Sequence, residues 1–497
     1  MDSPILSSAQ MREAEEAAFA RGVEVEALMD QAGAGITRAV RKFFPHPGRC
    51  IVYAGKGHNG GDALVAAERL QRAGWTIDIR LAFPEDDCSE LTRKKLQTLR
   101  AAPQISDASE SRVSPAIVLD GLLGLGAKHL LREPIRAAAR QINQLREKKN
   151  AHVFAVDLPT GLDGDSGETD PDCVVADFTI TIGFAKHGLI ADAALDFVGR
   201  LEVVPLPNLT LGDGAPNELL AAAHSLSSLL PRRKFSAYKN QFGRIGVVAG
   251  SKGFVGAALM TAQGALRAGA GLVEVFVSEE VYPIVAAAAP IEAMVKPVRS
   301  YRDLLEEKID IWAVGPGLGK SRASEVRRLI ERAERPMVVD ADGLNILAEK
   351  IDTLKRCRGP RLVTPHPGEI KRLFDPGKMS RAGTARNFCE QFPVTLLLKG
   401  SRTIVAERDR PLSFNTTGNP GMASGGMGDV LTGVCAGLLG RKLSLYDAAR
   451  LGAWVCGRAA EMAIFISGAS EESLLASDVL DHLGDAFNEL RNPNLYL

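Results

Sequence analysis

Tyr53-Ala-Gly-Lys-Gly-His-Asn-Gly-Gly-Asp-Ala-Leu64 is the stretch of this 497-residue sequence that decides the fold. It joins a short strand-like run at residues 50–54 to a helical pattern at residues 61–73. Its glycines let the backbone turn sharply and approach a ligand closely, as phosphate-binding loops do. The spacing is neither GxGxxG nor a Walker motif. By itself the stretch fits a plain glycine turn with Asp62 as a helix-capping residue equally well.

The alternation of strands and helices continues beyond this loop. Strand-like runs at residues 76–82, 116–120 and 153–157 are separated by helical stretches, which is typical of βαβ units and a parallel sheet. The loops Asp120-Gly-Leu-Leu-Gly-Leu-Gly126 and Asp157-Leu-Pro-Thr-Gly161 follow two of these strands. Because parallel strands end at the same edge, these loops are expected to gather where open α/β sheets bind ligands.

A second α/β series follows a turn-rich stretch. We place the domain boundary at about residues 205–228, giving domains at residues 1–212 and 225–497. After residue 421 the pattern is almost wholly helical. The strand-like runs of the second half are residues 244–249, 272–277, 309–314, 337–340, 361–364 and 394–399.

Composition narrows the possible partners. Lys plus Arg and Asp plus Glu each number 60, so net charge gives no long-range attraction to nucleic acid or an anionic membrane. Hydrophobic residues at 45% and charged residues at 24% are typical of a globular chain. Seven scattered cysteines without CxxC spacing disfavour a disulfide framework, and no signal peptide or run of ~20 apolar residues is present. We therefore expect a cytoplasmic protein without nucleic-acid or membrane partners.

The first half resembles the YjeF N-terminal family, the NAD(P)H-hydrate epimerase domain. The resemblance rests on the three loops above, on Thr181-Ile-Gly-Phe-Ala-Lys186 and on Leu28-Met-Asp-Gln-Ala-Gly33, and it spans most of residues 5–205. It implies a Rossmann-like parallel three-layer sandwich. It also implies a K⁺ ion held by Asn59, Asp120 and Thr160, whose oxygen atoms suit a hard cation.

The same resemblance implies a set of contacts to hydrated NAD(P)H. The residues are His58, Asn59, Gly60, Gly61, Asp62, Gly124, Leu125, Gly126, Ala127, Lys128, His129, Leu130 and Asp157. We expect Asp157 to handle the proton in epimerisation, with Lys186 as a second candidate whose alternative is a solvated surface lysine. Three positions depart from the family: His58 replaces the usual Asn, Ala63 the usual Gly, and Leu125 the usual Thr or aromatic.

The second half contains Asn419-Pro-Gly-Met-Ala-Ser-Gly-Gly-Met-Gly-Asp429, a glycine-rich turn that opens into a helix. Free N–H groups and the positive end of the helix dipole point toward whatever is bound there, and Asp429 is placed to accept a proton from a substrate hydroxyl. The pairing suits phosphoryl transfer to an alcohol; its alternative is an ordinary capped helix start. By contrast, Gly315-Pro-Gly-Leu-Gly-Lys-Ser321 misses the P-loop spacing, since Val314 stands where Gly is needed.

This turn resembles the anion hole of the ribokinase-like superfamily. Together with Asp340-Ala-Asp-Gly-Leu-Asn345, Thr364-Pro-His-Pro-Gly-Glu369 and Leu398-Lys-Gly-Ser-Arg-Thr403, it resembles the ADP-dependent NAD(P)H-hydrate dehydratase domain over about residues 228–490. Asp429 is then the catalytic base, and Mg²⁺ accompanies ADP as co-substrate. The implied contacts are Ala258, Gly317, His366 and Asp429 to the hydrate, and Lys399, Gly400, Ser401, Arg402, Thr403 and Gly428 to ADP or AMP. Met427 replaces the usual Thr of this loop.

Together the resemblances imply a homo-oligomeric, bifunctional repair enzyme. It would interconvert (R)- and (S)-NAD(P)H hydrate and dehydrate the (S) epimer while ADP becomes AMP and phosphate. One alternative is a ribokinase-like vitamin or sugar kinase with a regulatory nucleotide-binding domain. Another makes the first half a binding module only, although a scaffold has no need to retain Asn59, Asp120, Asp157 and Thr160.

Overall fold

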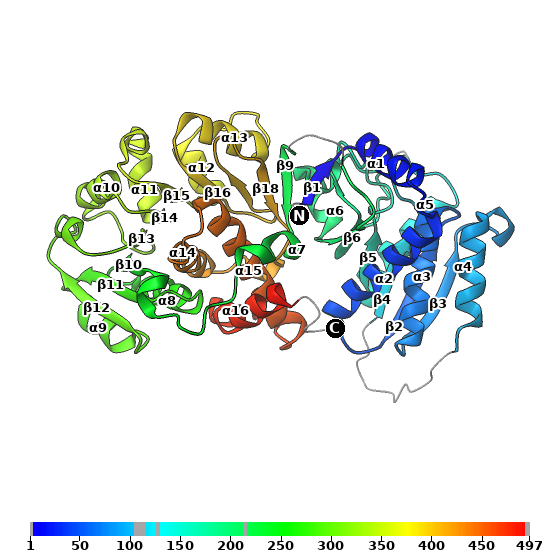
Figure 1. Ribbon diagram of the computed structural model, residues 1–497, viewed down its shortest axis with the longest axis horizontal. Helices are drawn as coiled ribbons and strands as arrows, with labels where there is room; N and C mark the ends of the chain where they lie inside the picture. The colour runs from blue at the N-terminus through cyan, green and yellow to red at the C-terminus, as the bar shows by residue number, and fades with distance from the viewer. Residues whose placement is uncertain (1–2, 104–115, 126–129, 212–215, 493–497) are drawn as a thin grey trace. The chain divides into compact units, whose positions relative to one another are not determined.

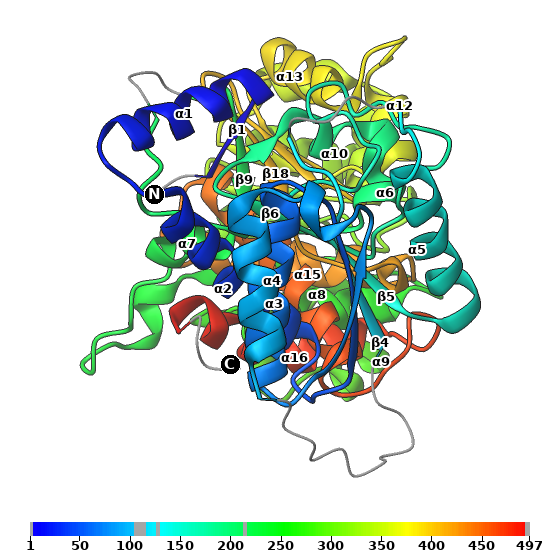
Figure 2. The same ribbon diagram turned by 90° about the vertical axis from the view of Figure 1, so that its right-hand side faces the viewer.

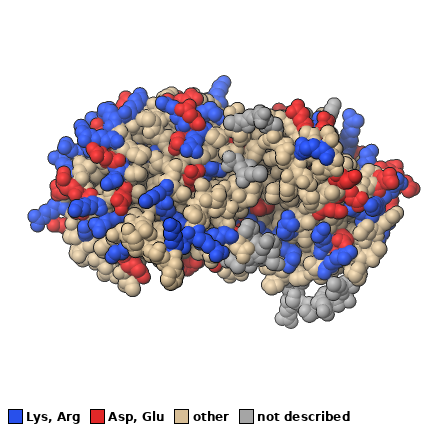
Figure 3. Space-filling model, viewed as in Figure 1, with Lys and Arg blue, Asp and Glu red and all other residues tan. Residues whose placement is uncertain are grey.

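The computed structural model describes residues 3–103, 116–125, 130–211 and 216–492. The chain forms two compact units that divide between Pro216 and Asn217 (Figure 1). Within the described residues, no helix is long and apolar enough to cross a bilayer. Lys and Arg are interspersed with Asp and Glu over the face shown in Figure 3.

The N-terminal unit is built on a parallel sheet with the strand order β3-β2-β4-β5-β6-β8. The predicted strands at residues 50–54, 76–82, 116–120 and 153–157 are confirmed to within one residue. A separate short parallel pair, β1 with β7, sets Leu6 beside Lys186. The strands are β1 (Ser3–Leu6), β2 (Arg49–Ala54), β3 (Thr76–Leu81), β4 (Ala116–Gly121), β5 (His152–Val156), β6 (Phe178–Ile182), β7 (Ala185–Lys186) and β8 (Arg200–Val204).

Helices cover both faces of this sheet, because successive side chains of a strand point to opposite sides. Ile51, Tyr53 and Val118 pack with Ile135 and Ile142 of α5. In Figure 2, α3 and α4 lie side by side across the sheet from α5. The helices are α1 (Ser8–Ala20), α2 (Val25–Phe43), α3 (His58–Arg72), α4 (Glu90–Ala101), α5 (Ile135–Lys149) and α6 (Leu195–Val198).

The C-terminal unit has a mixed sheet in the order β12-β11-β10-β13-β14-β15-β16-β17-β18-β9. The run from β12 to β16 is parallel, and β17 is antiparallel to both of its neighbours. The six predicted strands of this half are confirmed to within two residues. The strands are β9 (Glu218–Ala221), β10 (Arg244–Val248), β11 (Leu272–Ser278), β12 (Ala293–Val298), β13 (Ile311–Val314), β14 (Met337–Val339), β15 (Arg361–Val363), β16 (Thr395–Leu398), β17 (Ile404–Ala406) and β18 (Leu412–Asn415).

The helices of this unit include the predicted helical C-terminal part. They are α7 (Ala223–Leu226), α8 (Val255–Arg267), α9 (Tyr282–Ala288), α10 (Ala323–Arg332), α11 (Asp342–Ala348), α12 (Pro367–Leu373), α13 (Arg381–Gln391), α14 (Met427–Leu439), α15 (Leu445–Phe465) and α16 (Ala476–Arg491). Helix α14 packs backbone to backbone on α8, since a Cβ on Gly433 would overlap the Thr261 carbonyl oxygen. A Cβ on Gly264 would lie 2.6 Å from the Val430 carbonyl oxygen. The expected α/β class with parallel sheets is confirmed in both units.

Candidate active sites

In the N-terminal unit, Asp120 and Thr160 form a buried hydrogen-bonded pair at the carboxyl ends of β4 and β5. The Thr160 hydroxyl donates to Asp120 Oδ1 at 2.7 Å, and the Thr160 N–H donates to Oδ2 at 2.8 Å. Asp120 is fully buried, and burial raises its pKa to about 6 even though these hydrogen bonds lower it. A nearby cation stabilises the ionised form of a buried carboxyl of this kind.

Asn59 lies beside this pair and turns an oxygen toward the same loop. Its Nδ2 donates to the Leu123 carbonyl at 2.9 Å, which leaves Oδ1 as an acceptor, and a Cβ on Gly124 would lie 3.2 Å from that Oδ1. The Leu123 N–H in turn donates to Thr160 Oγ1 at 3.2 Å. The three predicted K⁺ ligands thus belong to one local network of oxygen atoms, and this donor set fits a hard cation.

Asp157 forms a buried ion pair with Lys186 at the same edge of the sheet. Lys186 is fully buried and also donates to the Ile182 carbonyl at 3.2 Å, so the alternative of a solvated surface lysine is wrong. Asp157 Oδ1 also accepts from the Ile182 N–H at 3.1 Å. Asp157 has φ +67°, a backbone strain of the kind that concentrates at functional sites.

Two further carboxyls, those of Asp62 and Glu15, interact electrostatically with this ion pair. Asp62 has a pKa well above its usual range because of burial and because the carboxylates of Asp157 and Glu15 repel its charge, while Lys186 opposes the shift. Burial likewise raises the pKa of Glu15, on α1. The helix α3 begins at His58 with Gly57 as its cap, so the reading of Asp62 as the capping residue is wrong. Glu15 was absent from the sequence analysis because α1 carries no motif.

The remaining predicted residues of this unit differ in their exposure. Gly60 and Gly61 are buried, and a Cβ on Gly61 would lie 2.5 Å from Met29 Cε, so both serve close packing. His58 is exposed at the helix start, Leu125 is half-buried and Leu130 is exposed. Gly126, Ala127, Lys128 and His129 lie outside the described residues.

In the C-terminal unit, Lys399 and Asp340 meet where β16 and β14 end. Lys399 Nζ lies 2.7 Å from Asp340 Oδ1, and the Thr432 hydroxyl of α14 donates to Asp340 Oδ2 at 2.9 Å. Glu369 of α12 lies 3.8 Å from the same ammonium group. Burial alone would lower the pKa of Lys399, but the surrounding carboxylates raise it overall.

Asp429 occupies the first turn of α14, next to this ion pair. Gly426 caps the helix with φ +89°, and a Cβ on Gly428 would lie 3.3 Å from Lys399 Nζ. Burial and then the Asp340 carboxylate raise the pKa of Asp429 to about 6, against the effect of Lys399. A carboxylate of this pKa at a helix N-terminus is suited to accept a proton near neutral pH, beside N–H groups that favour an anion.

His366 caps α12 through its side chain. Its Nδ1 accepts from the Gly368 N–H at 2.9 Å, and Glu369 Oε2 accepts from the His366 N–H at 2.8 Å. Its side chain is about half exposed (51%), and its Nε2 lies 3.6 Å from Glu369 Oε2. The capping box orients this ring at the same sheet edge as Lys399.

The other two predicted hydrate contacts are Gly317, in the loop after β13, and Ala258, in helix α8. Ser251 Oγ donates to the Gly317 carbonyl at 2.7 Å, and Gly317 has φ +60°, which favours glycine. A Cβ on Gly317 would lie 2.9 Å from Phe254 Cβ, so the loop fits tightly against the start of α8. Ala258 is fully buried, and its predicted contact with substrate stays a prediction.

The segment predicted to hold the adenine nucleotide follows Lys399 directly. Gly400 has φ +154°, Ser401 is exposed, and Arg402 is buried. Thr403 Oγ1 donates to the Gly400 carbonyl at 3.1 Å, which closes the segment into a turn. Arg381 of α13 donates to the Arg402 carbonyl at 3.2 Å and was not predicted.

Asn419 is another residue that the sequence motif contained but the prediction omitted. Both polar atoms of its amide are buried and have no hydrogen-bond partner among the described residues.

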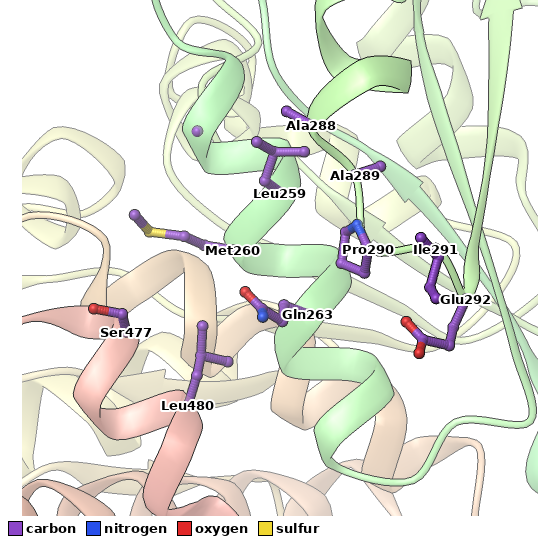
Figure 4. A pocket seen from close by; sticks show the side chains of 11 residues that line it. Leu259, Met260, Gln263, Ala288, Ala289, Pro290, Ile291, Glu292, Ser477 and Leu480 are labelled. Atoms are coloured by element: carbon purple, nitrogen blue, oxygen red, sulfur yellow. The ribbon is translucent and has the colours of Figure 1, made fainter.

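A cavity of about 550 Å³ lies between α8, the segment after α9, and α16 (Figure 4). Met260 lines it, and a Cβ on Gly426 would lie 2.5 Å from Met260 Sδ, so the cavity borders the glycine loop.

The fold and these two centres define an α/β enzyme with two separate sites. The sequence-family model of the YjeF-related protein N-terminus matches residues 25–188, and the sequence-family model of NAD(P)H-hydrate dehydratase matches residues 245–481. The chain is 36% identical over 488 residues to the bifunctional NAD(P)H-hydrate repair enzyme Nnr of Moorella thermoacetica, covering 92% of this chain and 91% of that protein.

A second relative and a solved structure complete the comparison. The bifunctional NAD(P)H-hydrate repair enzyme Nnr of Escherichia coli is 34% identical over 484 residues, covering 94% of this chain and 90% of that protein. The ADP/ATP-dependent NAD(P)H-hydrate dehydratase of Bacillus subtilis, co-crystallised with ATP and Mg²⁺, is 29% identical with a TM-score of 0.48, covering 54% of this chain and 97% of that one. The chain belongs to the family of bifunctional NAD(P)H-hydrate repair enzymes.

Proposed function

We propose that the N-terminal unit interconverts the (R) and (S) epimers of hydrated NAD(P)H, and that the C-terminal unit dehydrates the (S) epimer at the expense of ADP. The observation that supports this most is the Asp429 carboxyl, held with a raised pKa beside Lys399 at the glycine-rich start of α14. The ring hydroxyl at C6 of the hydrate is a poor leaving group. Phosphorylation turns it into a good one.

The residues of the C-terminal unit divide the work of that reaction. Asp429 removes the proton of the C6 hydroxyl as its oxygen attacks the terminal phosphorus of ADP, releasing AMP. Lys399 and the N–H groups at the start of α14 stabilise the transferred phosphoryl group. The phosphate ester then leaves as phosphate, driven by the ring nitrogen, and loss of the neighbouring ring proton gives NAD(P)H.

Two metal ions enter this proposal. The oxygens of Asn59, Asp120 and Thr160 would hold K⁺, which would stabilise the buried Asp120 carboxylate. Mg²⁺ is usually bound by phosphates, water and one or two carboxylates, and Glu369 and Asp340 supply carboxylates at the nucleotide edge. Mg²⁺ would neutralise charge on the ADP phosphates.

Other predictions remain proposals with structural support. All seven cysteines are free, which supports a reducing compartment such as the cytoplasm. Assembly into a homo-oligomer stays a prediction that follows from the family resemblance. Sedimentation equilibrium measures that assembly directly.

The decisive test is incubation of the protein with a mixture of hydrated NADH epimers, ADP and Mg²⁺. Absorbance of the reduced nicotinamide is expected to recover completely. If absorbance recovers only to the level expected from the (S) fraction, once uncatalysed epimerisation has been subtracted, the epimerase half of the proposal is wrong. No recovery, together with a stable phosphorylated product from a vitamin or sugar alcohol, would establish the kinase alternative instead.

A further inference from the structure

The glycine loop that leads into α14, residues 418–426, is held by α15 and by the segment between α15 and α16. At the start of the loop, the Gly418 N–H donates to Glu461 Oε1 of α15 at 2.8 Å. Further along, a Cβ on Gly421 would lie 2.6 Å from the carbonyl oxygen of Glu471. The position of this loop therefore depends on contacts with the helices that follow it in the sequence.

Glu461 accepts hydrogen bonds at both of its carboxylate oxygens. While Oε1 accepts from Gly418, Oε2 accepts from Arg458 Nη1 at 3.0 Å. Arg458 Nε in turn donates to Glu489 Oε2 of α16 at 2.9 Å. The side chains of Glu461, Arg458 and Glu489 are at most 5% exposed. The carboxylate that binds the loop is thus itself held by a buried ion network that joins α15 to α16.

Stability alone does not account for this network. Replacing a buried ion pair by apolar residues of similar volume is often neutral or stabilising, because burying charges is costly. The network does define positions, since a carboxylate accepts at two oxygens whereas a glutamine amide has one acceptor and one donor end. A carboxylate at position 461 can therefore serve the N–H of Gly418 and the guanidinium of Arg458 at the same time.

The start of the loop has a second contact with α15. The Thr417 hydroxyl donates to the Trp454 carbonyl at 2.8 Å, and a Cβ on Gly457 would overlap Thr417 Oγ1. Gly418 has φ +120°, in a region that glycine enters readily and leaves as readily. Because the backbone at Gly418 has this freedom, the hydrogen bond to Glu461 selects one conformation at the point where the loop begins.

We propose that Glu461 is a positioning residue of the dehydratase site, which fixes the glycine loop through the N–H of Gly418 and so sets the place of Asp429 and of the N–H groups at the start of α14. The inference rests on the proposed dehydratase function and deepens it. The nucleotide also contacts the segment after Lys399 in that proposal, so a displaced loop should impair phosphoryl transfer more than ADP binding.

The test compares Glu461→Gln with Glu489→Gln in the full-length protein. Both changes remove one negative charge from the same guanidinium, but only Glu461→Gln removes a carboxylate oxygen that binds the loop. With ADP, Mg²⁺ and the (S) epimer of NADH hydrate, Glu461→Gln is expected to lower kcat by about 10- to 100-fold. Glu489→Gln should leave kcat within about twofold of wild type.

Calorimetric titration with ADP and Mg²⁺ separates positioning from a loss of folded protein. The stoichiometry of binding gives the fraction of folded C-terminal units, and kcat is expressed per folded unit. The Kd for ADP should stay within about threefold of wild type in both variants. A merely structural role of Glu461 would lower the stoichiometry and leave kcat per folded unit unchanged, which would overturn the inference.

A second variant, Thr417→Val, loosens the start of the loop without touching Arg458. It removes one hydrogen bond, so kcat per folded unit should fall by about threefold to tenfold. Equal losses in Glu461→Gln and Glu489→Gln would also overturn the inference. If Glu461→Gln does not fold, an unchanged kcat in Thr417→Val overturns it instead. If the wild-type protein shows no ADP-dependent turnover, the proposed dehydratase function fails first.

Discussion

Each unit places one lysine among three carboxyl groups at the carboxyl edge of its sheet. Lys186 pairs with Asp157 and interacts electrostatically with Asp62 and Glu15 in one unit. Lys399 faces Asp340, Glu369 and Asp429 in the other. In both, the lysine pairs tightly with one aspartate and leaves another carboxyl with a raised pKa near a glycine-rich helix start.

The difference lies in what surrounds the second carboxyl. Asp429 is in the first turn of its helix, beside the open N–H groups that suit a phosphate. Asp62 is one turn further along α3, and a second acid, Glu15, comes from another helix. The comparison teaches that a similar pairing of a lysine with carboxyl groups adjoins a helix N-terminus suited to an anion in the C-terminal unit, while the acidic group of the N-terminal unit lies deeper along its helix.

The largest expected effect tests the independence of the two units. Asp429→Asn removes the base of the dehydratase, so ADP-dependent turnover of the (S) epimer should fall by about 10²- to 10⁴-fold. Exchange of the epimers should stay within about twofold of wild type, as followed by chromatography. Loss of both activities in folded protein would contradict two separate sites.

Breaking either ion pair should destabilise its unit, and the loss of stability should be larger for the pair whose lysine is more buried. Asp157→Asn leaves Lys186, whose side chain is 1% exposed, without its partner, and should destabilise its unit by about 3–5 kcal/mol. Asp340→Asn should destabilise less, because the Lys399 side chain is 19% exposed and Glu369 remains nearby. Denaturant unfolding of the two variants gives both values, and the reverse order would refute the comparison.

The pH dependence of the dehydratase follows from Asp429. The base works only when ionised and its pKa is about 6, so log kcat/KM should rise with pH below about 6 and level off above it. Stopped assays on the (S) epimer from pH 5 to 8, at fixed ionic strength, measure this limb. A flat profile below pH 6 would exclude Asp429 as the base.

Met427→Thr is expected to strengthen ADP binding slightly. Met427 is the first residue of α14, where a hydroxyl can donate to a phosphate oxygen. One such hydrogen bond contributes about 0.5–1.5 kcal/mol, or roughly two- to tenfold in Kd. Calorimetric titration with ADP and Mg²⁺ measures the change, and Met427→Val, a branched residue without a hydroxyl, is the control.

The smallest effect concerns stability. The folded-state pKa of Asp429 lies above the usual 3.8, so its stabilising contribution is present below pH 4 and is lost as pH rises through about 6. Asp429→Asn does not titrate. The variant should match wild type at pH 4 and exceed it in Tm by about 2–4 °C at pH 7.5, as scanning calorimetry can measure.

The sequence predicted the strands that alternate with helices but missed those outside the βαβ pattern. β17 and β18 form an antiparallel addition after the nucleotide segment, and β1 and β7 are too short to show a period. The glycine loops were found because glycine is required where backbones approach closely, as at Gly60 and Gly317. The glycine-rich helix start indicated Asp429 and the family resemblance indicated Asp157, whereas Arg381 reaches its segment only through tertiary packing.

The close contact between α8 and α14 limits which amino-acid substitutions this enzyme can accept. Gly264 and Gly433 press peptide backbones together without any intervening side chain, so no alternative rotamer can absorb a substitution there. The start of α14, which carries Asp429, is thus held by main-chain contacts that substitutions of apolar side chains barely alter. Mutational libraries should tolerate wide changes in the apolar residues around α14, yet reject even alanine at these two positions.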